Sequence, residues 1–283
     1  MPSAQGLLKK FTKMKTLPQT AIRLSKLVAD ENSSLMEIEN VIRMDPTLVL
    51  RILRLANSSY YGLQEKVDSI ARALVFIGIK NLRNTIVIET LKDVFKNSQE
   101  GEIFSRTNLW LHSAAVGICS QMISERLFKV KGEDAFLCGI LHDIGLIVED
   151  QVAKDLFLKA CQTYEPGSKQ ITEVERDTIG TDHCAVGHGL AIEWKLPSEV
   201  QDGIKDHHKH VNKISPSDLA GMIQVAEYFT ARLNIVPLKG MNGFISPPLN
   251  DHIREHLEVY KGLARDLPEE IEKAKEIYAS EWM

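Results

Sequence analysis

Apolar residues recur at the spacing of an α-helix along most of the chain, and strand-like alternation is hard to find. Ser34 and Glu37 form a capping-box pattern at the start of LMEIENVIRM. Asp45 and Pro46 then supply an N-cap and a first-turn proline for TLVLRILRLA. The stretches SIARALVFIG and KNLRNTIVIETLKDVF read as two further helices separated at Gly78. The pattern predicts an all-α protein.

The helix after Asp45 is apolar on nearly every side. From Leu48 to Leu55, Arg51 and Arg54 are its only polar positions. We therefore expect a central, buried helix. A buried guanidinium needs acceptors, so both arginines should point toward the second helical bundle or a carboxylate at the junction.

A polar stretch, KNSQEGEIFS at 96–105, separates two apolar-periodic regions. We place the boundary there, with an N-terminal helical subdomain over 1–100 and a second one over 101–283. The second contains helical patterns from Arg106 onward. It also contains NIVPLKGMNGFISPPLN at 234–250, a Gly/Pro-rich loop long enough to be a lid. An amphipathic acidic helix, DLPEEIEKAKEIYASEW, closes the chain.

Composition narrows the class of protein. The chain has 283 residues, 44% of them hydrophobic and 25% charged, with a net charge of −4, so no global field attracts nucleic acid or acidic lipid. No apolar run is long enough for a signal peptide core or a membrane span. Four cysteines lie scattered without CxxC spacing, which suits a reducing compartment. We expect a cytoplasmic protein.

The stretch GILHDIGLI at 139–147 places His142 and Asp143 inside an apolar run. An ionised carboxylate left alone there costs several kcal/mol, so the pair needs a partner. If DAFLCGILHDIGLI forms one helix, His142 and Asp143 lie opposite its core face. Gly139 falls between them and leaves a small cleared space.

Other imidazoles and one more carboxylate occupy inward or edge positions of apolar helices. The full candidate ligand set is His112, His142, Asp143, His183, His207, His208 and Glu227. A divalent transition metal (Fe, Mn, Zn, Co or Ni), as one or two ions, is the simplest common explanation. Two ions could turn a bound water into hydroxide and hold a phosphoryl group from both sides.

Each candidate residue also has a simpler explanation that involves no metal. A single core histidine is usually hydrogen-bonded rather than metal-bound, one member of the His207–His208 pair could cap its helix, and Glu227 could be a surface acid. His188 reads as a surface residue. His210, His252 and His256 sit in polar settings and receive no role.

Taken together, these residues resemble the HD superfamily of metal-dependent phosphohydrolases, whose signature includes an early His, a His-Asp doublet, further histidines and a late acid. More specifically, the chain resembles HDOD domain proteins, the HD-related output domains of bacterial signalling. The likeness is carried by LPQTAIRLSKLV, MDPTLVLRILRLANSSYYG, SIARALVFIGIKNLRN, LWLHSAA, AFLCGILHDIG, GTDHCAVGHGLAIEWKLP and DHH. The resemblance implies an N-terminal bundle packed on an HD-like bundle.

Two functions follow from this resemblance. The first is a signalling output module with protein partners, because many HDOD members have lost metal positions and act in regulation. The alternative is a phosphohydrolase for a nucleotide or phosphate ester. Asp143 would then ligate or bridge the metals, and His183 or His208 would steer the phosphate or protonate the leaving group.

Three departures from the related HD-GYP group argue against hydrolysis of cyclic-di-GMP. Leu146 replaces a lysine after HDIG, the GYP segment is absent, and Glu227 replaces the usual final Asp. We therefore predict weak hydrolysis or none.

Nucleic-acid binding is the least favoured function. ALVFIGIKNLRN mimics a helix-turn-helix with Arg72, Lys80 and Arg83 nearby, but the chain is acidic and lacks a clear basic stripe. The basic N-terminus could touch an acidic surface, although short lysine runs are usually just solvated.

Overall fold

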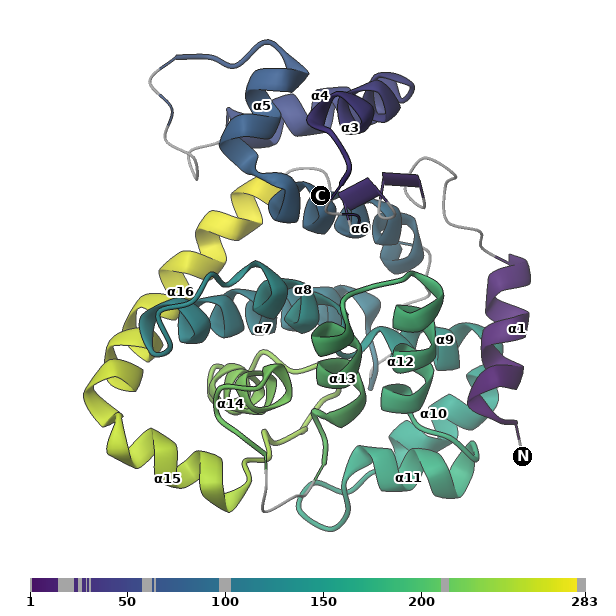
Figure 1. The fold of residues 1–283 in the computed structure, drawn as a ribbon. Helices are drawn as coiled ribbons and strands as arrows, with labels where there is room; N and C mark the ends of the chain where they lie inside the picture. Colours follow the sequence, from purple (N-terminus) through teal and green to yellow (C-terminus); the bar gives the residue numbers. More distant parts are fainter. Residues whose placement is uncertain are drawn as a thin grey trace.

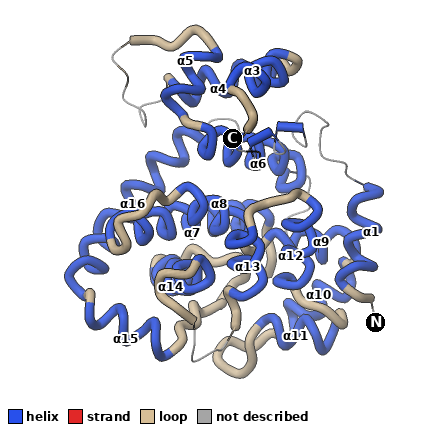
Figure 2. The backbone as a smooth tube through the Cα atoms, in the orientation of Figure 1, coloured by secondary structure: helices blue, strands red, loops and turns tan. Residues whose placement is uncertain are grey.

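The computed structural model describes residues 2–14, 23–24, 27–28, 30, 32–57, 63, 65–96, 103–209 and 214–278. These residues form helices joined by loops, as Figure 2 shows. Within them the only β-type pairing is one isolated bridge between Phe104 and Leu238. The predicted all-α class is confirmed.

Over residues 35–96, the described part of the chain forms four helices that lie in the upper part of the molecule in Figure 1. They are α3 (Leu35–Arg43), α4 (Pro46–Ala56), α5 (Ile70–Ile77) and α6 (Ile79–Lys96). The predicted caps are present: Ser34 and Glu37 form a complete capping box, and the Asp45 carboxylate accepts from the Leu48 amide at 3.2 Å. Gly78, at φ 79°, separates α5 from α6 as expected.

The larger part of the molecule is a bundle built around the long helix α7 (Arg106–Arg126). Its other helices are α8 (Glu133–Leu141), α9 (Ile144–Val152), α10 (Lys154–Thr163), α11 (Ile171–Thr178), α12 (His183–Glu193), α13 (Ser198–Asp206), α14 (Leu219–Arg232), α15 (Pro247–Glu255) and α16 (Leu257–Tyr278). In Figure 1, α16 runs up one side of the molecule from α15 toward the N-terminal helices, and it packs against α7. No described helix is long and apolar enough to cross a bilayer.

The buried apolar side chains form two clusters. The smaller joins α3, α4, α5 and the start of α6, and the larger fills the bundle around α7. The first helix, α1 (Ala4–Met14), contributes Leu7, Leu8 and Phe11 to the larger cluster by packing against α9 and α12. The predicted boundary segment at 96–105 and the stretch LPQTAIRLSKLV at 17–28 lie mostly outside the described residues.

The prediction for α4 is only partly right. Ile52 is fully buried, but Leu50 is 66% exposed, so α4 has one free face. On this helix Arg51 is half-buried and Arg54 is exposed. A short helix at the edge of a small cluster cannot cover its whole circumference.

The contact between the two parts is made by α6, which packs against both α8 and α7. Asp134 at the start of α8 pairs with Lys80 at 2.7 Å and with the buried guanidinium of Arg83. The Asn84 side-chain amide donates to the Glu133 carbonyl at 2.8 Å. These interactions tie the smaller cluster to the bundle.

The prediction of a single helix through GILHDIGLI is wrong. The helix is interrupted there: α8 ends at Leu141, His142 is its C-cap, and Asp143 is the N-cap of α9. The break lets the two side chains leave different helix ends instead of sharing one helical face.

Glycines explain how close the helices come at this break. A Cβ on Gly139 would lie 2.5 Å from the Gly117 Cα, so Gly139 allows α8 to touch α7. A Cβ on Gly145 would lie 2.1 Å from the His183 carbonyl oxygen, so Gly145 allows α9 to touch α12. Gly139 therefore serves helix packing, where we had expected it to clear space between His142 and Asp143.

The loop before α15 is anchored on the bundle. A Cβ on Gly243 would lie 2.6 Å from the Tyr228 Cα and 2.8 Å from the Glu227 carbonyl oxygen, so the backbone runs directly over α14. The helix expected from Asp266 onward is the second half of a longer one, α16, which begins at Leu257 and continues through Pro268.

Candidate metal centre

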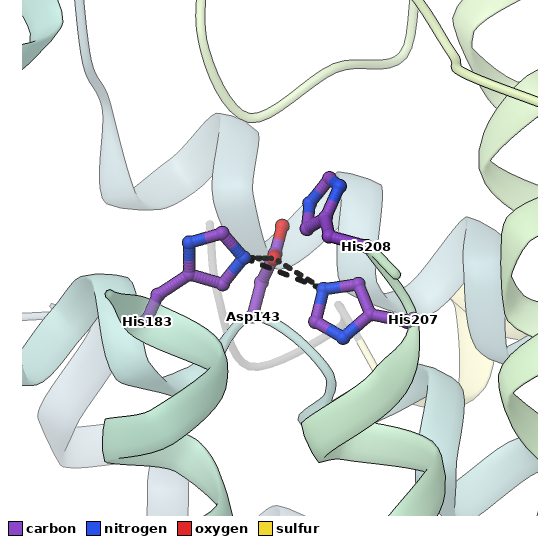
Figure 3. Close-up of side chains that lie close together, drawn as sticks. All are labelled: Asp143, His183, His207 and His208. Carbon is purple, nitrogen blue, oxygen red and sulfur yellow. Dashed lines mark hydrogen bonds and ion pairs between the residues drawn. The ribbon is translucent and has the colours of Figure 1, made fainter. Parts of the chain in front are cut away.

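All seven candidate ligands converge where six helices meet. They come from the middle of α7, the α8–α9 break, the start of α12, the end of α13 and the inner face of α14. Six are buried and the seventh, His208, has a side chain 10% exposed. Figure 3 shows His183, His207 and His208 arranged around Asp143.

The backbone fixes the orientation of three imidazoles. In each, Nδ1 faces a carbonyl oxygen, which can only accept, so Nδ1 carries the proton and Nε2 is left as the free ligand atom. The distances are 2.9 Å from His112 to Ile235, 2.7 Å from His142 to Gly139 and 2.7 Å from His207 to Ile204.

A buried carboxylate fixes His183 in the same way. Glu175 of α11 lies 2.7 Å from the His183 Nδ1 atom, and it also accepts from the His183 backbone amide at 3.0 Å. Both residues are completely buried. A carboxylate that hydrogen-bonds to one ring nitrogen of a metal-bound histidine sets its tautomer and raises its basicity.

The four free Nε2 atoms face one another in two pairs. His112 and His142 are separated by 3.2 Å, and His183 and His207 by 3.3 Å. Two unprotonated nitrogens at this distance repel, so each pair needs a positive charge between its members. A metal ion or a shared proton can supply that charge.

Asp143 lies between the two pairs. Its Oδ2 is 3.2 Å from the His142 Nε2, and its Oδ1 is 3.3 Å from the His183 Nε2. Neither oxygen accepts a hydrogen bond, although the residue is only 1% exposed. A buried carboxylate without hydrogen bonds is strongly disfavoured unless a cation compensates it.

Two ligand groups result. One contains His112, His142 and Glu227, and the other contains Asp143, His183, His207 and His208, with one donor atom per residue lying within 4.8 Å of the others in its group. The Glu227 Oε1 is 3.7 Å from the His142 Nε2 and 4.0 Å from the His208 Nε2, so it lies between the groups as well. The residues fit one or two ions of a metal that accepts nitrogen and oxygen ligands.

The electrostatic field of the site favours positive charge around His183 and His207. Burial opposes their protonation, yet the pKa of His183 is raised well above its usual value by Glu175 and Cys184, and that of His207 by Cys184 and Asp143. Burial and neighbouring His142 lower the pKa of His112 to about 4, so this imidazole is neutral at pH 7.

The two carboxylic acids respond differently. Burial raises the pKa of Glu227 despite the nearby histidines. Burial also opposes ionisation of Asp143, but His142 and the other imidazoles hold its pKa well below the usual range. The anion therefore sits at the middle of the cluster.

Sequence reasoning missed three groups that surround the ligands. Glu175 lies eight residues before His183, on another helix, and nothing in the local pattern marks it. Glu149 is also completely buried, and neither of its carboxyl oxygens has a hydrogen-bond partner. The thiol of Cys184 lies 3.6 Å from the His183 Nε2, and its adjacency to His183 was the one available signal.

Comparison with known proteins agrees with this architecture. The family model described as the HDOD domain matches residues 14–210. An uncharacterized protein of Treponema pallidum (strain Nichols) is 25% identical over 199 residues, which are 68% of this chain and 37% of that protein. The chain thus spans well under half the length of this curated relative.

Solved structures share the fold over nearly the whole chain. An HDOD domain protein of Geobacter sulfurreducens is 23% identical with a TM-score of 0.73, and the match covers 96% of this chain and 97% of the other. A protein of Shewanella amazonensis SB2B, described as a proposed phosphohydrolase, is 24% identical with a TM-score of 0.70 and 98% coverage of both chains. A proposed signal transduction protein of Marinobacter aquaeolei VT8 gives a TM-score of 0.74 at 20% identity, over 96% of this chain and 61% of the other.

The family match covers well over half of the chain and includes the His-Asp doublet, the paired imidazoles and their helical frame. This chain belongs to the HDOD domain family.

Proposed function

We propose that this protein is a signal-transduction output module that holds one or two divalent transition metal ions, and that regulation through protein partners is its main role. The observation that carries the metal assignment is the arrangement around Asp143. Four imidazoles with anchored Nδ1 atoms point their Nε2 atoms at a buried carboxylate that accepts no hydrogen bond.

The charges in the site support a binding role over catalysis on phosphate esters. Among the described residues, the ion-pair partners of Asp143 and Glu227 are all imidazoles. A transferring phosphoryl group needs cationic groups where negative charge develops. Without a lysine or arginine in that set, we expect weak hydrolysis of cyclic-di-GMP or none.

The basic residues of α5 and α6 also fit a protein-interaction module better than a nucleic-acid reader. Lys80 and Arg83 pair with Asp134, and Arg72 lies 3.7 Å from Glu65. Cations already paired within the fold contribute little to phosphate binding. The four cysteines are free thiols, which fits the cytoplasmic location that we propose.

The alternative function is a metal-dependent phosphohydrolase acting on a nucleotide or phosphate ester. It is favoured by the position of Asp143, which presents one oxygen to each ligand group and could bridge two metals. A bound metal would supply an activated water. Of the two histidines, His208 is the more exposed and would be placed to steer the phosphate or meet a leaving group, whereas both ring nitrogens of His183 already have partners.

A substrate screen separates the two functions. The protein loaded with manganese or iron is tested against cyclic-di-GMP, nucleotides and simple phosphate esters. The output-module assignment predicts turnover far below 1 s⁻¹, the low end of ordinary enzymes. Turnover near about 1 s⁻¹ that an Asp143→Ala variant abolishes would make the protein an enzyme.

A further inference from the structure

A second group of metal-ligating side chains lies far along the chain from the centre, at the corner between α15 and α16. His252, Glu255 and His256 each offer a ligand atom, and these atoms lie within 4.8 Å of one another. The spacing is i, i+3 and i+4, so the three side chains share one face of the last turn of α15. Histidines four residues apart on a helix are a recurrent zinc-binding arrangement.

The corner keeps the two imidazoles together. The His256 backbone amide donates to the His252 carbonyl at 3.1 Å, which continues the helical turn, and the ring centroids are 4.4 Å apart. Since His256 caps α15 and α16 begins at the next residue, the pair lies where the chain changes direction.

Packing holds the His252 ring in place. It stacks on Phe128, which follows α7, with centroids 5.7 Å apart and an interplanar angle of 8°. Tyr260 of α16 meets it edge-on at 5.9 Å. A ligand that is already ordered loses little entropy on binding a metal.

One nitrogen of His252 has no partner. Its Nε2 is shielded from solvent and makes no hydrogen bond, although the ring as a whole is half-buried. A buried polar atom without a hydrogen-bond partner needs a physical explanation, and a bound ion is one.

We infer that His252, Glu255 and His256 form a second metal site, independent of the centre at Asp143, for one divalent ion of the zinc class. Two imidazoles and one carboxylate are the protein ligands of many three-ligand zinc sites, with water at the open position. Glu255 and His256 are exposed, so the ion can exchange with solvent. A bound ion would hold α15 and α16 at a fixed angle beside the end of α7.

The test is a zinc titration by isothermal calorimetry on the protein as purified, without stripping metal from the buried centre. We expect an exchangeable zinc-binding event in the wild type. His256→Ala and Glu255→Gln should each weaken it by at least about tenfold, the cost known even for outer-shell partners of a metal. Both residues are exposed, so the variants should fold.

Matched controls remove the same chemical groups elsewhere. His188→Ala on α12 and Glu258→Gln, one turn after Glu255 on α16, should leave the event unchanged. An anomalous difference peak beside His252 and His256 in zinc-soaked crystals would locate the ion.

The inference is overturned if the wild type shows no exchangeable zinc, or if His256→Ala and Glu255→Gln bind zinc as the wild type does. Equal losses in the control variants would overturn it too. Zinc that binds at the centre would do so equally in the wild type and in all these variants, so the comparison among them isolates the corner.

Discussion

At the scale of single residues, the centre depends on how each imidazole is held. Carbonyl oxygens orient His112, His142 and His207, whereas a carboxylate orients His183. That carboxylate belongs to Glu175, and a second buried glutamate, Glu149, differs from it in its hydrogen-bond partners. The Glu175 carboxylate contacts both the ring and the backbone amide of His183, whereas the carboxyl oxygens of Glu149 have no hydrogen-bond partner.

The first prediction concerns Glu175. Glu175→Gln replaces a carboxylate with an amide that can no longer enforce the same His183 tautomer. We expect the affinity of the ligand group containing His183 for zinc to fall by roughly 10–100-fold, as for other outer-shell partners. Competition with a chelator measures this affinity. Glu149→Gln is the matched control, and an equal loss in both variants would remove the special role of Glu175.

The second prediction concerns pH and Glu149. Burial and the nearby Glu175 carboxylate raise the pKa of Glu149 well above its usual value. The folded state therefore holds this proton at pH values where the unfolded chain has released it, and stability from this group falls as pH rises above about 4.3. Glu149→Gln removes that dependence.

Urea unfolding at pH 5 and pH 8 tests this sign. The free energy of unfolding of Glu149→Gln, relative to that of the wild type, should increase as the pH rises. A gain that is the same at both pH values, or larger at pH 5, would contradict the assigned direction of the pKa shift.

At the scale of elements, close helix contacts bring the ligands together. Gly145 is one such point, because its position leaves no room for a Cβ beside the His183 backbone. The sequence contains this glycine in HDIG, but only the packing of α9 on α12 shows what it does.

The third prediction follows from that contact. Gly145→Ala should separate α9 from α12, destabilise the protein by about 1–3 kcal/mol or more, as overpacking does, and reduce metal content. Gly262→Ala on α16 is the control, since a Cβ there meets nothing within 4 Å. It should stabilise by about 0.4–1 kcal/mol. Thermal unfolding compares the two variants, and similar stability in both would refute the steric argument.

Helix positions and caps could be predicted from local pattern because they depend on neighbours in the sequence. Ser34, Glu37 and Asp45 are examples whose roles the structure confirms. The interruption at His142 and Asp143 could not be predicted this way, because the apolar period continues across it. The seven candidate ligands could be selected one by one as inward-facing polar residues. Their pairing across helices, and the support from Glu175, depend on tertiary packing.

At the scale of the whole molecule, two hydrophobic clusters are joined through α6 and α8. Asp134 is the centre of the polar part of that junction. Burial opposes its ionisation, but Lys80 and Arg83 hold its pKa below the usual value. Its contribution to stability is therefore present above the unfolded pKa and is lost as pH falls through the folded pKa.

The fourth prediction concerns this junction. Arg83→Met removes the buried partner of Asp134. It should lower the free energy needed to open the contact between the two parts by on the order of 1–3 kcal/mol. Hydrogen exchange of α6 amides measures the loosening. Arg72→Met, which removes an exposed arginine of α5, should have little effect. Equal exchange in the two variants would mean that Asp134 does not hold the junction.

The claim on which the account depends most is that the site around Asp143 binds metal. Its most direct test is the metal content per chain, measured by inductively coupled plasma mass spectrometry on protein purified without an affinity metal column and then reconstituted. We predict about one or two transition metal ions per chain, strongly reduced in a His142→Ala/Asp143→Ala double variant whose helicity is checked by circular dichroism. Metal below about a tenth of an ion per chain, unchanged in the double variant, would contradict the account.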